Sequence, residues 1–418
     1  MAKKSFSDFA DFQRHMDALG MFHMRLGFDR MREAADRLDI LRSPVPLAQV
    51  VGTNGKGSTA FFLAQLAKEH ELAVGLFTSP HFLTLRERIR TNGRPVSEGH
   101  VLDWANTVHA ACNDLGLTYF ETVTLVAMVG FIAQRVDLIV LEAGLGGRND
   151  ATSLWTPDLL LITPIGLDHD HIIGPGLENI TRDKAGAIKP GSVVVSALQP
   201  AVVRDILEQE AARHGVNLRD LDQIAGMPER TAIAPALPGD HQRDNARLAL
   251  AGWTSLARRH GWPVRPDAVG NALASSFWPG RLQRVFGPPE IILDGAHNAP
   301  ALETLNAALG KLGIRPAAVI FTCMRDKDLV GMAPLIRQLT TGPIFVPELP
   351  TYQRCRPSQE IVQELGPQAR AEPDPALALA QARRLAAHSN VPILVCGSLY
   401  LLAEIYALHP EWLDECPE

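Results

Sequence analysis

Residues 49–67 read QVVGTNGKGSTAFFLAQLA, an apolar run followed by a glycine-rich turn and a segment with helical character. This order of strand, turn and helix is the setting of a phosphate-binding loop, in which backbone N–H groups and a helix N-terminus face an anion. Lys56 would add a full positive charge. The usual loop places Ser or Thr directly after the lysine, whereas Gly57 here separates Lys56 from Ser58. We expect a nucleotide site; a tight turn that holds no ligand is the alternative.

Further apolar runs follow this loop in the first half of the chain and alternate with amphipathic segments. They are LAVGLFTS (72–79), VDLIVLEAG (136–144), DLLLITPI (158–165) and SVVVSAL (192–198). Near-continuous apolar strands separated by helical patterns predict α/β architecture with a mostly parallel sheet covered on both faces. Functional loops of such sheets lie at the carboxyl ends of the strands, so we expect the polar sequences that end these runs to converge.

The length of 418 residues exceeds one typical domain of about 100 to 200 residues, so two domains are expected. Prolines interrupt the pattern at about 217–240, a helical segment runs from Gln242 to about His260, and Pro279-Gly280 follows. Strand and helix patterns then alternate again through EIILDGAHN, AAVIFTCM, GPIFVPEL and VPILVCGS. We therefore expect a larger domain over 1–279 and a smaller, Rossmann-like α/β domain over 280–418.

Composition and charge favour a soluble cytoplasmic protein. The net charge of -6 gives no general attraction for nucleic acid, and the longest apolar stretch, of about 12 residues, is too short to cross a membrane. The N-terminus lacks the apolar run of a signal peptide. The cysteines form no C-x-x-C pair and indicate free thiols: Cys112, Cys323, Cys355, Cys396 and Cys416.

Two strand ends carry candidate metal ligands. Glu142 ends an apolar strand before a glycine-rich loop, and a carboxylate there suits Mg²⁺, which takes few carboxylates together with phosphate oxygens. An N-cap or salt-bridge role for Glu142 is the alternative. Asp168, His169, Asp170 and His171 follow the next strand, and we favour His169 as a ligand while His171 fits an ordinary loop equally well.

The roles of two further segments, around Lys184 and in DGAHN, cannot be assigned from residue spacing alone. Lys184 lies in a helix expected to stop near Pro190-Gly191, and on spacing alone an exposed, solvated lysine is the default. In DGAHN, Asp294 at a strand end can reach a ribose or a phosphate-bound water, whereas Asn298 fits a helix N-cap. Gly397 and Ser398 repeat the order of strand, glycine and hydroxyl without specifying a ligand.

Taken in order, these motifs resemble the folylpolyglutamate synthase and dihydrofolate synthase family, which is related to the Mur peptidoglycan ligases. The resemblance extends from about Asp17 to the C-terminus. The motifs that carry it are GTNGKGS, TSPH, TYFE, LEAGLGGRNDATS, GLDH, RDKAGAIK, HQRDNA, WPGR, DGAHN and CGSLY.

The resemblance implies an ATP- and folate-binding Mur ligase-like domain, a C-terminal glutamate-binding domain, and bound Mg²⁺. The ATP contacts that it implies are Gly55, Lys56, Gly57, Ser58, Asn245, Arg281 and Asp294. The implied metal ligands are Ser79, Glu142 and His169, and the implied catalytic residues are Lys56, Lys184 and His297. His297 would lie where glutamate binds, and Lys184 matches a lysine that can be carbamylated in this family, which would reverse its charge.

The activity implied is ATP-dependent ligation of L-glutamate to dihydropteroate and to tetrahydrofolates through an acyl phosphate, carried out by a monomer. The implied pterin-acid contacts are Met21, Phe22, His23, Met24, Thr118, Tyr119, Phe120, Glu121, Asn149, Asp150 and Ala151. This sequence departs from the family pattern at Asn149, Ser153, Asp183 and Ala187.

Three alternatives remain. A mono-functional folylpolyglutamate synthase would not accept dihydropteroate. A Mur-type ligase acting on a nucleotide-linked substrate would be expected to carry a further domain before the ATP loop, where 51 residues precede Gly52. A nucleotide-dependent switch would bind ATP without ligation, although Glu142, His169 and Asp294 at strand ends exceed what a switch needs.

Overall fold

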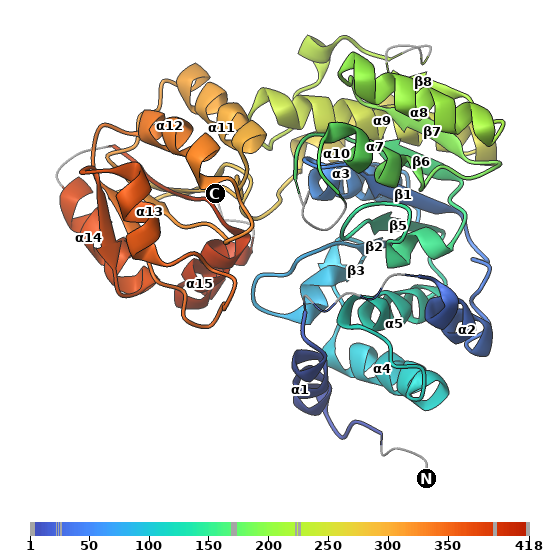
Figure 1. Ribbon diagram of the computed structural model, residues 1–418. Coiled ribbons are helices and arrows are strands. Elements are labelled where there is room, and N and C mark those ends of the chain that lie inside the picture. Colours follow the sequence, from blue (N-terminus) through green and yellow to red (C-terminus); the bar gives the residue numbers. More distant parts are fainter. Residues whose placement is uncertain are drawn as a thin grey trace. The chain divides into compact units, whose positions relative to one another are not determined.

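The structure is a computed structural model that describes residues 5–21, 23, 25, 27–168, 174–221, 224, 227–387 and 391–414. The chain divides into two units, each with its own sheet (Figure 1). Unit 1 comprises Met1–Ala234 and Arg243–Ser276, and unit 2 comprises Pro235–Gln242 and Phe277–Glu418. The chain thus enters unit 2 briefly, returns to unit 1 and enters unit 2 again.

The sheet of unit 1 has, in the described part, the strand order β4-β3-β2-β5-β1-β6-β7-β8. The neighbouring strands β2, β5, β1, β6, β7 and β8 are parallel to one another. Strands β3 and β4 pair antiparallel at one side of the sheet, next to β2. The strands are β1 (Leu47–Val51), β2 (Val74–Phe77), β3 (Ile89–Thr91), β4 (Arg94–Pro95), β5 (Leu138–Glu142), β6 (Leu159–Ile162), β7 (Val193–Ser196) and β8 (Leu218–Asp220). The five apolar runs predicted as parallel strands are confirmed as β1, β2, β5, β6 and β7.

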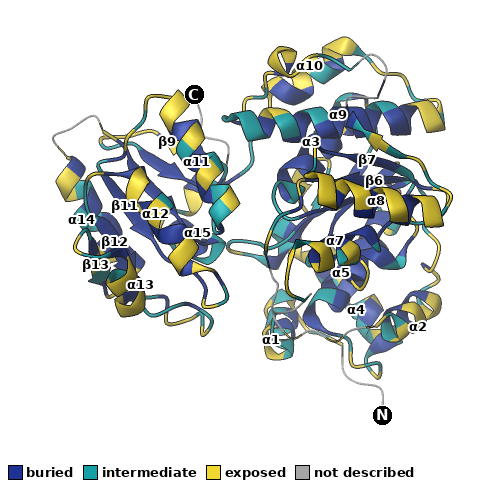
Figure 2. Ribbon diagram, turned by 45° about the horizontal axis from the view of Figure 1, so that its top comes forward, coloured by how far each residue is buried: buried dark blue, intermediate teal, exposed yellow. Residues whose placement is uncertain are grey.

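Helices cover both faces of this sheet, which explains why its central strands β1, β2, β5, β6 and β7 are buried at nearly every position. The helices are α1 (Phe9–Leu19), α2 (Asp29–Arg37), α3 (Lys56–Glu69), α4 (Glu98–Cys112), α5 (Tyr119–Ala133), α7 (Leu177–Ala185), α8 (Ala201–Arg213), α9 (Asp240–His260) and α10 (Pro266–Ala274). Helices α3 and α9 pack on one face, and α5, α7 and α8 pack on the other. Figure 2 shows the strands buried and the outer faces of the helices exposed.

Unit 2 has, in its described part, the strand order β13-β12-β11-β14-β10-β9. Only β9 is antiparallel to its neighbour. The strands are β9 (Gln283–Val285), β10 (Ile291–Leu293), β11 (Ala318–Phe321), β12 (Ile344–Pro347), β13 (Ala369–Glu372) and β14 (Ile393–Cys396). The helices are α11 (Ala299–Lys311), α12 (Leu329–Leu339), α13 (Ser358–Leu365), α14 (Pro375–Ala386) and α15 (Leu399–Leu408).

The short strands β3, β4 and β13 were not predicted from the sequence. Strand β13 reads ARAE, and its two middle residues are exposed or half-buried, so it lacks the apolar run that marked the central strands. The hairpin of β3 and β4 is similarly short and polar. Edge strands pair on one side only, so their sequences need not be apolar.

The longest apolar stretch forms α5, which has 15 residues. Among the described residues, no helix is both long enough and apolar enough to cross a membrane.

Candidate active site

The glycine-rich turn after β1 forms a loop that leads directly into α3, as the sequence predicted. Gly55 is the N-cap of α3 with φ +86°, a left-handed conformation that favours glycine. A Cβ atom at Gly55 would collide with the side-chain amide of Asn245, so this residue of α9 lies against the loop. Lys56 Nζ donates to Thr53 O at 3.0 Å. The loop is thus compact and already contacts one of the implied ATP residues.

Gly57 and Ser58 are buried in the first turn of α3. The first intrahelical hydrogen bond runs from the Thr59 N–H to Gly55 O at 2.9 Å. The amides of Lys56, Gly57 and Ser58 precede this bond, and such amides have no intrahelical acceptor. They are therefore the groups that this helix N-terminus presents to an anion, together with the positive end of its dipole.

Glu142 and Ser79 meet at the ends of two neighbouring strands. Glu142, 5% exposed, ends β5, and its Oε2 accepts a hydrogen bond from the Ser79 N–H at 2.9 Å. Because β2, β5, β1 and β6 are neighbours in that order, these residues, the phosphate loop and Asp168 follow adjacent strands. The bond to a backbone amide is neither the N-cap nor the salt bridge considered from the sequence.

A hydroxyl and a carboxylate beside a phosphate loop form an oxygen donor set that fits Mg²⁺. His169, the third implied ligand, lies outside the described residues, as do Asp170 and His171. Within the described residues, no group of three or more His, Cys, Asp or Glu side chains could hold a metal. Ser79 and Glu142 thus account for the described part of the implied site.

Lys184 is buried, which contradicts the solvated lysine expected from spacing alone. It is 5% exposed, and its Nζ donates to Gly52 O at 2.8 Å. Burial is the main cause that lowers the pKa of Lys184 to about 7, and the positive charge of Lys56 lowers it further. Nearby carboxylates raise this pKa, but their effect is smaller. A Cβ atom at Gly147 would lie 2.7 Å from Lys184 Cα, so the loop after β5 packs on the backbone of α7.

Helix α7 ends earlier than predicted, at Ala185 rather than near Pro190-Gly191. Gly186 is its C-cap, and the Gly186 N–H bonds to Asp183 O at 3.1 Å. The Arg148 N–H bonds to the same oxygen at 2.8 Å, so the loop after β5 occupies the end of the helix. This tertiary contact has no signal in the sequence of α7.

The TYFE motif is the N-terminus of α5 and forms a capping box. Thr118 Oγ1 accepts from the Glu121 N–H at 3.4 Å, and Glu121 Oε2 accepts from the Thr118 N–H at 2.8 Å. Glu121 also pairs with Arg30 at 2.8 Å. Phe120 is half-buried and packs on Phe77, with ring centroids 5.7 Å apart. Within TYFE, Thr118, Tyr119 and Glu121 are buried, so Phe120 is the most accessible residue of the motif.

The other implied pterin contacts differ in exposure. Asn149 is exposed, whereas Asp150 is buried and accepts hydrogen bonds from the Thr152 N–H at 2.9 Å and the Leu145 N–H at 2.9 Å. Burial raises the pKa of Asp150. Ala151 is buried, Met21 is half-buried and His23 is exposed; Phe22 and Met24 lie outside the described residues. The Asp150 carboxylate therefore holds its own loop together.

Sequence reasoning missed a buried arginine in this region. Arg88 is 2% exposed, and its Nε donates to His81 Nδ1 at 2.8 Å. Burial and the charge of Arg88 lower the pKa of His81 to about 3, so His81 is a neutral acceptor. Arg88 stands among other charged residues in LRERIR, and nothing in that pattern marks it as buried.

In unit 2, the WPGR and DGAHN motifs form one cluster. Both oxygens of Asp294 accept backbone hydrogen bonds, from the Leu282 N–H and the Ala296 N–H, each at 2.9 Å. The Gly295 N–H bonds to Gly280 O at 2.8 Å, which brings Arg281 next to DGAHN. These bonds fix the turn that carries Arg281.

The residues after Asp294 and after β14 begin helices. His297 Nδ1 lies 2.7 Å from Gly295 O, and since a carbonyl oxygen only accepts, Nδ1 carries the proton. Asn298 caps α11 through the Ala301 N–H, as the alternative from the sequence proposed. Ser398 caps α15 through the Tyr400 N–H.

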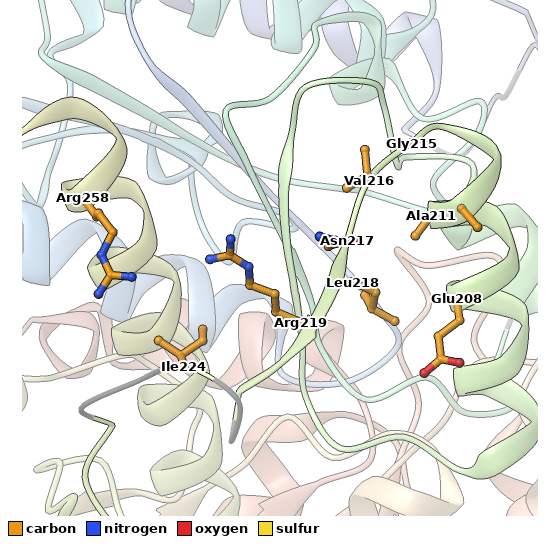
Figure 3. A pocket seen from close by; sticks show the side chains of 10 residues that line it. Glu208, Ala211, Gly215, Val216, Asn217, Leu218, Arg219, Ile224 and Arg258 are labelled. Carbon is orange, nitrogen blue, oxygen red and sulfur yellow. The ribbon is translucent and has the colours of Figure 1, made fainter.

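Unit 1 contains a cavity of about 870 Å³, and Figure 3 shows side chains that line it. Its lining includes Ala211 at the end of α8, Leu218 at the start of β8, and the side chains of Arg219 and Arg258. Because β8 is parallel to β7, its start lies with the amino ends of the parallel strands. The phosphate loop follows the carboxyl end of β1, at the opposite end of the strands. The cavity is therefore separate from the phosphate loop.

Comparison with known proteins shows similarity over nearly the whole chain. Residues 280–399 match the family described as Mur ligase, glutamate ligase domain. The dihydrofolate synthase/folylpolyglutamate synthase of Escherichia coli (strain K12) is 32% identical, with 96% of this chain and 95% of that protein covered.

Two solved structures share the whole fold. The structure of E. coli FolC in complex with DHPP and ADP has a TM-score of 0.87 at 26% identity, covering 98% of this chain and 99% of the other. The bifunctional enzyme of Yersinia pestis, complexed with AMPPNP and Mn ion, has a TM-score of 0.86 at 29% identity, with the same coverage. The chain belongs to the dihydrofolate synthase/folylpolyglutamate synthase family of Mur-type ligases.

Proposed function

We propose that this protein is an ATP-dependent ligase that joins L-glutamate to dihydropteroate and adds γ-linked glutamates to folates. The observation that carries the proposal is the contact between Ser79 and Glu142 beside a phosphate loop, with Lys184 buried behind that loop. The relatives with ADP and DHPP, or with AMPPNP and Mn, support ATP, a divalent metal and a pterin substrate.

ATP would bind through the loop at Gly55, Lys56, Gly57 and Ser58. The first-turn amides of α3 and the Lys56 ammonium would neutralise phosphate oxygens. Ser79 and Glu142, with His169, would hold Mg²⁺, which when bound would neutralise the charge on the transferring phosphoryl group. Asn245 would contact the same nucleotide, because it lies against Gly55.

The reaction needs no nucleophilic side chain. The substrate carboxylate attacks the γ-phosphorus of ATP to give an acyl phosphate and ADP, and the amino group of glutamate then displaces phosphate. The protein contributes by positioning the reactants and by stabilising the charge that develops. Arg281 and Asp294 are the proposed further ATP contacts, and His297 the proposed glutamate contact.

Lys184 would act as a carbamate. A neutral amine attacks carbon dioxide, the new N–C bond leaves a carboxylate, and a proton is released. A pKa of about 7 leaves a sizeable neutral fraction at physiological pH. The positive charge of Lys56, which disfavours protonated Lys184, would favour the negative carbamate. The remaining N–H could still donate to Gly52 O.

An assay with ATP and labelled glutamate tests the proposal. We expect glutamate-dependent release of phosphate with dihydropteroate and with tetrahydrofolate, each measured separately. Extension of tetrahydrofolate without formation of dihydrofolate would establish a mono-functional folylpolyglutamate synthase instead. ATP binding that survives Glu142→Ala, together with no glutamate-dependent phosphate release by the wild type, would indicate a nucleotide switch.

A further inference from the structure

Arg88 makes hydrogen bonds to the turn that carries Ser79, one before and one after that residue. Before Ser79, the Thr78 N–H donates to the backbone oxygen of Arg88 at 3.0 Å, which extends the pairing of β2 with β3. After Ser79, the side chain of Arg88 donates from Nε to His81 Nδ1 at 2.8 Å. Ser79 itself donates its N–H to Glu142. Three hydrogen bonds thus hold the turn at Thr78, Ser79 and His81, and Arg88 makes two of them, one through its backbone oxygen and one through its side chain.

The bond between Arg88 and His81 has a fixed direction. An arginine Nε always carries a hydrogen, so His81 Nδ1 must accept and the ring proton of His81 resides on Nε2. Arg88 is 2% exposed, and a guanidinium buried to this extent costs free energy unless its N–H groups are satisfied. Removal of the acceptor at His81 should therefore disturb Arg88, and removal of Arg88 should free the His81 ring.

The other edge of Arg88 contacts residues of two further segments. Its Nη2 lies 3.7 Å from Met21 Sδ, and its guanidinium lies 5.4 Å from the ring centroid of Tyr119, at the start of α5. Met21 and Tyr119 belong to the segments proposed to hold the pterin acid. One buried side chain thus contacts both the turn of the proposed metal ligand and the proposed acid site.

We propose that Arg88 is a positioning residue, which acts through His81 to hold Ser79 in place for the metal and through Met21 and Tyr119 to fix the acid site relative to it. The inference rests on the proposed function of Ser79 as a metal ligand. Outer partners of metal ligands typically change metal affinity or activity by about tenfold to a hundredfold when they are removed. Arg88 bonds the residues on either side of such a ligand, at Thr78 and His81, and we expect an effect of that size.

Matched substitutions separate positioning from general stability. Arg88→Met keeps an unbranched side chain as far as the position of Nε and removes every donor. Arg86→Met is the control, because Arg86 lies in the same short helix, Leu85–Arg88, and its Nε donates to Val96 O at 2.7 Å, away from the turn. His81→Leu removes the acceptor, whereas His81→Asn retains an oxygen acceptor near the position of Nδ1.

The first measurement is binding of Mn²⁺ to the full chain in the presence of a non-hydrolysable ATP analogue, followed by electron paramagnetic resonance. We expect Arg88→Met and His81→Leu to weaken binding about tenfold or more. Arg86→Met and His81→Asn should stay within about twofold of the wild type. In the assay, Arg88→Met should also raise KM for the acid substrate more than it lowers kcat, which a general loss of stability would not do.

Ser79→Ala, measured in parallel, distinguishes failure of the inference from failure of the proposed function. If Ser79→Ala weakens Mn²⁺ binding and Arg88→Met does not, the positioning role is overturned. If Ser79→Ala leaves Mn²⁺ binding unchanged, Ser79 is not a ligand, and hydrogen exchange of the metal-free protein decides. Faster exchange around Thr78–Phe82 in Arg88→Met but not in Arg86→Met supports positioning, and equal exchange overturns it. Should Arg88→Met fail to fold, the comparison of His81→Leu with His81→Asn applies the same criteria.

Discussion

Lys184 of α7 is hydrogen-bonded through Nζ to the carbonyl oxygen of Gly52, the first glycine of the phosphate loop. The bond joins a helix after β6 to the loop after β1, and it holds a titratable amine in a site from which water is nearly excluded. The lysine thus has a structural contact in the free protein and a chemical property, a low pKa, that suits modification.

The burial of Lys184 should make the stability of the fold depend on pH. The pKa of Lys184 is about 7 in the folded protein against 10.5 for an ordinary lysine, so the folded state binds fewer protons than the unfolded state between these values. Stability therefore rises with pH across that window, by up to about 1.4 kcal/mol per pH unit. We expect Lys184→Met to remove this rise in urea unfolding measured at pH 7, 8 and 9. Lys68→Met, which changes an exposed lysine of α3, should retain it.

Carbamylation of Lys184 can be observed directly. We expect a carbamate signal in the ¹³C NMR spectrum of the protein in ¹³C-bicarbonate, because the neutral amine that reacts with carbon dioxide becomes the major form above pH 7. The signal should increase from pH 6.5 to 8 and be absent in Lys184→Arg. A spectrum of Lys184→Arg identical to that of the wild type would assign the carbamate to another amine.

Gly57 should be required for close approach of ATP. We expect Gly57→Thr to weaken binding of a non-hydrolysable ATP analogue by about tenfold or more, which corresponds to at least about 1.4 kcal/mol. The reason is that a side chain in the buried first turn of α3 would intrude beside the amides that face the phosphates. Isothermal titration calorimetry measures the effect, with Gly99→Thr in the open first turn of α4 as the control. Unchanged affinity in Gly57→Thr would show that the glycine between Lys56 and Ser58 is not needed for ATP to approach the loop.

Asp294 should be needed for the turn that carries Arg281. Its two carboxylate oxygens accept from two backbone N–H groups, and an asparagine offers only one oxygen. Asp294→Asn would leave one buried N–H without an acceptor, at a cost of about 1–3 kcal/mol. We expect a lower Tm by differential scanning calorimetry and a higher KM for ATP. Asp374→Ala, which removes the side-chain N-cap of α14, is a control that should lower Tm alone.

The central strands and the convergence of their ends were predictable because apolar runs and glycine-rich loops are local signals. Glu142 could be placed beside the phosphate loop from the sequence, since parallel strands bring their carboxyl ends to one edge. The burial of Lys184 was not predictable from spacing, because it depends on how closely Gly147 lets a distant loop approach α7. Arg88 was missed for the same reason, since its partners His81, Met21 and Tyr119 come from three separate segments.

Asn245, which lies against Gly55, belongs to the part of unit 1 that follows the chain's first passage through unit 2. A fragment that ends at Ala234 would lack α9, and the face of β6 at Leu159 and Leu161, on which Gly252 packs, would be exposed. An expression fragment of the ATP-binding unit would therefore have to extend to Ser276 and include the excursion through Pro235–Gln242. The continuity of the nucleotide site thus constrains where this chain can be divided.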